Sequence, residues 1–67
     1  MSIARVTELI SASSKSFDDA VKKGIARATD TLDGVTGAWV ESQKVIIEDG
    51  KIAEYRVNLR VTFVLKD

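Results

Sequence analysis

The clearest pattern in the sequence is an alternation of apolar and polar side chains between residues 53 and 65. One side of this segment is apolar throughout: Ala53, Tyr55, Val57, Leu59, Val61, Phe63 and Leu65. The other side is polar except at Val64: Glu54, Arg56, Asn58, Arg60 and Thr62. Because successive side chains of a strand point to opposite faces, this pattern predicts a long strand with one buried face.

Residues 17–32 follow a helical period instead. Apolar or small residues recur at the spacing of one helix face: Phe17, Ala20, Val21, Gly24, Ile25, Ala28 and Leu32. Ser16 is the predicted N-cap, and Asp19 lies at the capping-box spacing. Gly34 suits a left-handed C-cap position. Gly24 is expected to permit close approach of the helix to a sheet.

Two further segments read as strands, residues 3–10 and residues 38–48, and residues 11–15 form the expected loop into the helix. Three successive apolar residues at 45–47 break the alternation, which either a β-bulge or burial against another subunit explains. Asp49-Gly50 predicts a short hairpin turn. The order is therefore β-α-β-β. We expect an α+β fold with one amphipathic helix packed on a three-stranded antiparallel sheet, residues 1–67 forming a single domain.

Composition excludes several functions. Lys plus Arg and Asp plus Glu are 10 each, and the chain has no His and no Cys. A net charge of zero argues against a protein that binds nucleic acid by neutralising phosphates. The missing imidazole and thiol remove the commonest catalytic groups and a Cys-ligated zinc, so an enzyme is not expected. No apolar run approaches the ~20 residues of a membrane span. With no signal peptide recognised, the expected location is cytoplasmic.

The chain is also short for a stable core. A protein of this size buries only about 60% of the surface of its unfolded chain. Without a disulfide or an evident metal site, self-association is the expected source of additional stability.

The candidate binding residues lie on the predicted strands. Arg56 and Arg60 project to the same face, and Lys44 can join them across the hairpin. Such groups bind phosphates and carboxylates, or they form an ordinary solvated and salt-bridged face. Trp39, the single Trp, is either a core or interface residue or a stacking surface for a flat ligand. Five carboxylates suit a hard cation such as calcium, but without EF-hand spacing: Asp18, Asp19, Glu41, Glu48 and Asp49.

The joint pattern resembles the dodecins, a family of small flavin-binding proteins. The resemblance covers nearly the whole chain and is strongest at residues 16–21 (SFDDAV), 25–28 (IARA), 31–32 (TL) and 55–63 (YRVNLRVTF). It implies a hollow homododecamer that binds flavins in pairs at subunit interfaces, for storage or quenching and not for catalysis. The implied partners are other copies of the chain and a small molecule, with no nucleic acid and no membrane.

The resemblance implies ligand-binding roles for Trp39, Lys44 and Arg56, with riboflavin, FMN or FAD as the cofactor. The family's flavin-stacking Trp falls on Gly37, two residues before Trp39. The family's flavin-bonding Gln falls on Arg56, which is a donor only and cannot replace the donor–acceptor pair of an amide. Lys44 falls where many bacterial dodecins carry a basic residue near the ligand phosphate.

A second hypothesis stays open beside the flavin. Some dodecin-like proteins lack both the Trp and the Gln, and one such branch is described as calcium-binding. The resemblance therefore also allows a dodecin-like shell that binds calcium or a phosphorylated ligand, or that is purely structural. In that case Arg56, Arg60 and Lys44 would bind anions or would pair with Glu54 and Glu41 between subunits. No set of metal ligands can be identified from one chain.

Overall fold

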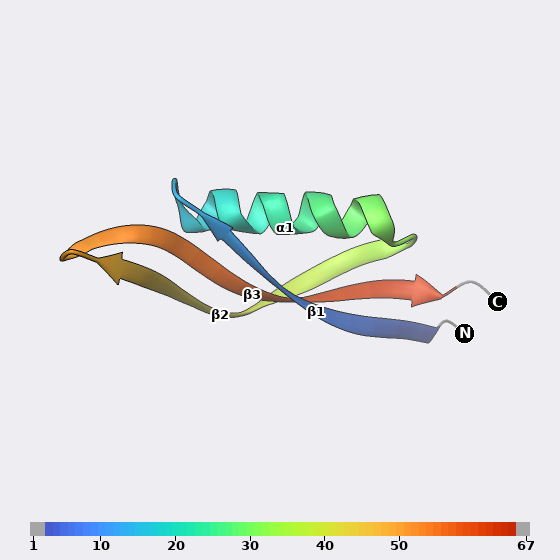
Figure 1. The fold of residues 1–67 in the computed structure, drawn as a ribbon. Coiled ribbons are helices and arrows are strands. Elements are labelled where there is room, and N and C mark those ends of the chain that lie inside the picture. The colour runs from blue at the N-terminus through green and yellow to red at the C-terminus, as the bar shows by residue number, and fades with distance from the viewer. Residues whose placement is uncertain (1–2, 66–67) are drawn as a thin grey trace.

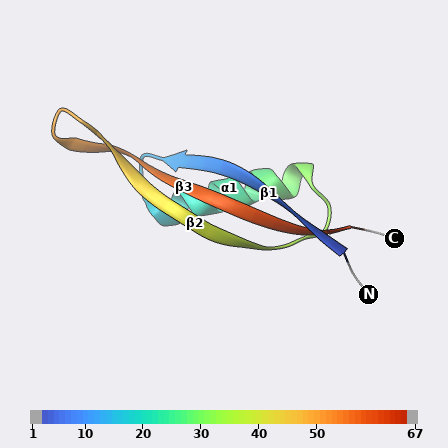
Figure 2. The ribbon, with the colours of Figure 1, turned by 90° about the horizontal axis from the view of Figure 1, so that it is seen from below.

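A long central strand organises the fold. The computed structural model describes residues 3–65, which form β1 (Ile3–Ser13), α1 (Phe17–Thr31), β2 (Val35–Glu48) and β3 (Lys51–Leu65). The sheet order is β1-β3-β2 and both pairings are antiparallel. Figure 1 shows α1 lying along one face of this sheet, and Figure 2 shows β3 between its two neighbours. The predicted α+β fold with β-α-β-β order is confirmed.

The core lies between α1 and the sheet. Its fully buried apolar residues come from the helix and from alternate positions of β3: Ala20, Ala28, Val57, Leu59 and Val61. Gly24 lies in this contact, because a Cβ built there would be 2.6 Å from Leu59 Cδ1 and 3.2 Å from Leu9 Cδ1. The expected close approach of helix and sheet is therefore confirmed.

The start of α1 is tied to the end of β1. The Ser16 hydroxyl accepts a hydrogen bond from the backbone N–H of Asp19 at 3.0 Å, which confirms the predicted N-cap. The Asp19 carboxylate makes no capping box with Ser16 among the hydrogen bonds of the described residues. It accepts instead from the hydroxyl of buried Ser13 at 2.5 Å and pairs with Lys23 at 3.2 Å. These two contacts, the Ser13 bond foremost, lower the pKa of Asp19 below its ordinary value of 3.8.

The strands are longer than the sequence pattern predicts. β1 continues to Ser13 and does not end at residue 10, because residues 11–13 pair with Val57, Arg56 and Tyr55 of the long β3 strand. β2 begins at Val35 and β3 at Lys51. Gly34 has the expected positive φ of 75°, but it is not the helix cap. That position is held by Leu32 in an extended conformation, and Gly34 lies in the turn beyond it.

The β2–β3 hairpin turns as predicted, at Asp49 and Gly50, both of which have positive φ. Its strands are not in continuous register. Irregularities fall between Val35 and Gly37, between Val40 and Ser42, and between Ile46 and Ile47. At the last of these the residue without a partner is Ala53 of β3, so residues 45–47 of β2 keep their alternation and the bulge does not explain their three apolar side chains. In Figure 1 the hairpin extends well beyond the N-terminal end of α1.

Much apolar surface stays uncovered in one chain. The exposed large hydrophobic residues are Ile3, Val6, Ile10, Trp39, Val40, Ile47, Ile52 and Leu65. These side chains leave apolar surface open to contact with another molecule. Among residues 3–65, no helix is long and apolar enough to cross a membrane.

The turn between α1 and β2 gives the first prediction. A Cβ at Gly34 would lie 2.6 Å from the Val64 carbonyl oxygen, and the positive φ adds backbone strain. We expect Gly34→Ala to lower the free energy of unfolding by at least about 1 kcal/mol. Gly37→Ala is the control, because no atom lies within 4 Å of a Cβ built there. Thermal denaturation at equal protein concentrations measures both; equal stabilities would contradict the prediction.

The contact between Ser13 and Asp19 gives the second prediction. Because the pKa of Asp19 is lowered on folding, its stabilising effect is present above the unfolded pKa and is lost as the pH falls through the folded pKa. Ser13→Ala should raise the Asp19 pKa toward 3.8 and destabilise the protein at neutral pH, with the difference shrinking in acid. Carboxyl NMR titration and denaturation at several pH values measure this. Exposed Ser14→Ala is the control, and an unchanged Asp19 pKa in Ser13→Ala would contradict the prediction.

Candidate functional site

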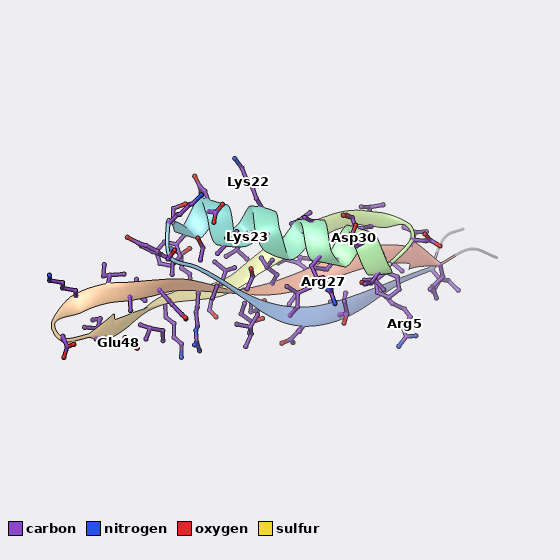
Figure 3. All side chains as sticks on the ribbon, turned by 45° about the horizontal axis from the view of Figure 1, so that its top comes forward. Arg5, Lys22, Lys23, Arg27, Asp30 and Glu48 are labelled. Atoms are coloured by element: carbon purple, nitrogen blue, oxygen red, sulfur yellow. The ribbon has the colours of Figure 1, made fainter. Side chains whose placement is uncertain are left out.

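The candidate site lies on the face of the sheet away from α1, which we call the open face. Cα partners in antiparallel strands point their side chains to the same face, so the register defines this surface. It carries Glu54, Arg56, Asn58, Arg60 and Thr62 of β3, Val6, Glu8, Ile10 and Ala12 of β1, and Trp39, Ser42, Lys44 and Ile46 of β2. Figure 3 shows side chains projecting from the sheet on this side, while Lys22 points away from the sheet on the outer side of α1.

A β-bulge brings the predicted ligand residues to one face. Trp39 and Lys44 are five residues apart, so a strictly alternating strand would point them to opposite faces. The irregularity between Val40 and Ser42 adds one residue and restores both to the open face, Trp39 opposite Arg60 and Lys44 opposite Arg56. Bulges commonly re-aim side chains in this way.

Lys44 and Arg56 form a pair of cations across the hairpin. They are direct Cα partners on the open face, where like charges repel. The Arg56 Nε donates to Glu54 Oε1 at 2.9 Å, which offsets one of the two charges. The remaining positive charge favours an anionic or carbonyl oxygen between the two side chains.

These two cations border a hollow of about 350 Å³. Its lining is Ile10, Ser42, Gln43, Lys44, Arg56, Val57 and Asn58. Asn58 of β3 is one of the lining residues, and its partners Ile10 on β1 and Ser42 on β2 flank it. The Asn58 Oδ1 is buried without a hydrogen-bond partner. A desolvated acceptor of this kind is stabilised when a donor is supplied.

Trp39 forms a second centre on the open face. Its side chain is 56% exposed, so Trp39 is not a core residue of the single chain. The guanidinium carbon of Arg60 lies over the indole, 5.4 Å from the ring centroid. Arg60 Nη1 is 3.8 Å from Glu41 Oε2. The pairs of Arg56 with Glu54 and of Arg60 with Glu41, which one sequence hypothesis placed between subunits, thus form within one chain.

The structure brings together only part of the predicted site. Lys44 and Arg56 adjoin, whereas Trp39 does not line the hollow. Its partner Arg60 is four residues from Arg56, about 13 Å along the strand at roughly 3.3 Å per residue. Sequence reasoning did not assign roles to Asn58 and Ile10. Asn58 was visible as a polar residue of the alternating strand, but Ile10 joins the hollow only through the pairing of β1 with β3.

The acidic residues considered for calcium do not gather in one chain. Between residues 3 and 65 there is no group of three His, Cys, Asp or Glu side chains arranged to hold a metal ion. Asp19 is engaged at the helix start with Ser13 and Lys23, and Glu41 lies near Arg60.

Together these features define a small α+β protein with a ligand-sized hollow and an exposed indole on an uncovered sheet face. The dodecin family model matches residues 3–66, and the chain belongs to the dodecin family. The resemblance seen in the sequence is thereby confirmed.

Individual relatives agree with this assignment. The calcium dodecin of Mycobacterium tuberculosis is 29% identical over 66 residues, 98% of this chain and 93% of the relative. The dodecin of Streptomyces coelicolor has a TM-score of 0.93 at 33% identity, covering 98% of this chain and 94% of its own. The crystal structure of the Mycobacterium tuberculosis calcium dodecin has a TM-score of 0.84 at 26% identity, covering 96% and 91%. The family is thus shown by sequence and by fold, and relatives include one named for calcium.

Proposed function

We propose that this protein is a non-enzymatic dodecin that sequesters a flavin on its open face as a homo-oligomer. Trp39 stacks on the isoalloxazine ring, and Lys44 and Arg56 bind ring or phosphate oxygens. The observation that carries the proposal is that an exposed indole and a cation-lined hollow share one uncovered face of the sheet.

The stacking role rests on the exposure and surroundings of Trp39. An indole that is 56% exposed can bury flat aromatic area on binding, and stacked rings gain beyond simple burial. Trp39 lies on the same face as Gly37, the position of the family's stacking Trp, because their β3 partners Arg60 and Thr62 are two residues apart. The displaced Trp can thus present its ring to the same side of the sheet.

The polar role rests on the hollow. Lys44 and Arg56 supply donors and positive charge, and Asn58 supplies the carboxamide that Arg56 lacks. The flavin ring carries carbonyl oxygens and a ring N–H, which suit this mixture of groups. FMN carries its ring at one end and its phosphate at the other, so it can reach both Trp39 and the cations.

Self-assembly rests on the balance of buried and exposed apolar side chains. Only five apolar residues are fully buried among residues 3–65, while eight large ones are exposed. Further copies of the chain would cover this surface and the edges of the sheet. We infer a hollow homododecamer of residues 1–67, each chain folded as one domain. We also infer a cytoplasmic location, and neither nucleic acid nor membrane as a partner.

Calcium is the second candidate ligand, because the Mycobacterium tuberculosis relative is named for it. The described part of one chain offers no cluster of three carboxylates. We propose that acidic residues of neighbouring copies would form such a calcium site. The flavin hypothesis uses groups that the described part of one chain already places on one face.

The stacking role is tested with riboflavin. We expect wild type to quench riboflavin fluorescence and Trp39→Ala to abolish this, because electron transfer and stacking both need the indole. Trp39→Phe should bind more weakly than wild type and quench less. Fluorescence titration measures both, with Lys22→Ala on the outer helix face as control. No quenching by wild type, together with a binding heat for calcium in calorimetry, would replace the flavin hypothesis by the calcium one.

The cationic role is tested by comparing FMN with riboflavin, which lacks the phosphate. If Lys44 binds the phosphate, Lys44→Ala should weaken FMN by at least about tenfold and riboflavin by less, because a charge-assisted bond contributes about 1.5–3 kcal/mol and each 1.4 kcal/mol is a factor of ten. The effect on FMN should also shrink as the salt concentration rises. Equal losses for the two flavins would remove Lys44 from the phosphate site.

A further inference from the structure

The displacement of the Trp has a consequence for its neighbours. The residue opposite Gly37 on β3 is Thr62, whereas the residue opposite Trp39 is Arg60. A Trp at position 37 would therefore have a neutral hydroxyl residue beside it. At position 39 it meets a guanidinium, which is planar and stacks well on aromatic rings.

Three contacts hold this arrangement on the open face. The Arg60 guanidinium carbon lies over the indole at 5.4 Å from the ring centroid. Its Nη1 lies 3.8 Å from Glu41 Oε2, so the carboxylate attracts the guanidinium from the same strand that carries Trp39. The Arg60 Nε is buried without a hydrogen-bond partner, which indicates that the stem of the side chain is covered although its tip reaches solvent.

We propose that Arg60 is a positioning residue for Trp39. Its guanidinium covers one face of the indole and holds the ring in one orientation, so Trp39 offers its opposite face to a single planar ligand. The part that concerns a ligand rests on the proposed flavin function. The part that concerns the ring itself is independent of any ligand, because the contact exists in the chain alone.

A purely structural ion pair would behave differently. If Arg60 only balances the charge of Glu41, Arg60→Lys preserves the function, because lysine keeps the positive charge. If Arg60 positions the indole, a lysine at this position does not hold the ring in one orientation, because its compact ammonium cannot stack as a plane. Arg60→Gln removes the charge while keeping a planar end group, and Glu41→Gln removes the attraction while keeping Arg60.

The experiment without ligand uses the protein's single Trp as its own probe. Acrylamide quenching and fluorescence anisotropy report the exposure and mobility of Trp39 in the assembled protein. In Arg60→Lys and Arg60→Gln we expect faster quenching and lower anisotropy, and in Glu41→Gln a smaller change in the same direction. Arg27→Gln, on the exposed part of α1, is the control for loss of one arginine. Gel filtration confirms that each variant assembles as wild type does.

Riboflavin titration then tests the ligand side. An exposed cation–π contact changes an equilibrium constant by a factor of about two to five, so Arg60→Lys should raise the dissociation constant by that factor. The expected stoichiometry is one riboflavin per Trp39. Unchanged Trp39 fluorescence in both Arg60 variants would overturn the positioning role, and two riboflavins per Trp39 would overturn the single free face. If wild type binds no riboflavin while Trp39 is more mobile and more easily quenched in the Arg60 variants, the positioning role of Arg60 is supported and the proposed flavin function is contradicted.

Discussion

A single helix can cover only one face of a three-stranded sheet, and the rest of this structure follows from that constraint. α1 approaches closely enough at Gly24 to bury Val57, Leu59 and Val61 of β3, and this side of the sheet becomes the core. The opposite side cannot be buried within the chain, so its side chains are free to meet a ligand or another copy. The uncovered face is therefore the proposed ligand site, and its exposed Val6, Ile10 and Trp39 can also contact another copy of the chain.

The geometry of that face is set by the β2–β3 hairpin. The turn at Asp49 and Gly50 starts the pairing, which places Lys44 opposite Arg56, and the irregularity after Val40 then places Trp39 opposite Arg60. Each cation of β3 thus acquires a different partner on β2. Lys44 and Arg56 leave positive charge at the edge of the hollow. Arg60, in contrast, lies over the indole of Trp39. A shift of the pairing by one residue would separate both pairs, so register is as important to the site as the residues themselves.

Much of the fold could be predicted from local pattern. Alternation along residues 53–65 is enough to assign the two faces of β3, and Ser16 and Asp49-Gly50 mark a helix start and a turn by their own backbone preferences. Non-local pairing could not be predicted in this way. β1 runs to Ser13 only because β3 is long enough to pair with it, and Asp19 binds Ser13 because the strand ends beside the helix start. For the same reason, local pattern could not predict that Ile10 and Asn58 are neighbours, because they lie on two strands far apart in the sequence. The bulge that turns Trp39 and Lys44 to one face has no local signal at all.

Native mass spectrometry of the assembled protein, before and after addition of FMN, tests the central claim most directly. It reports the number of copies and the number of bound ligands in one spectrum. Our account predicts a homododecamer that gains the mass of FMN, with the gain lost when both Trp39 and Lys44 are replaced by Ala. A monomer, or a dodecamer whose mass is unchanged by FMN, would contradict the claim that the open face binds a flavin within an assembly.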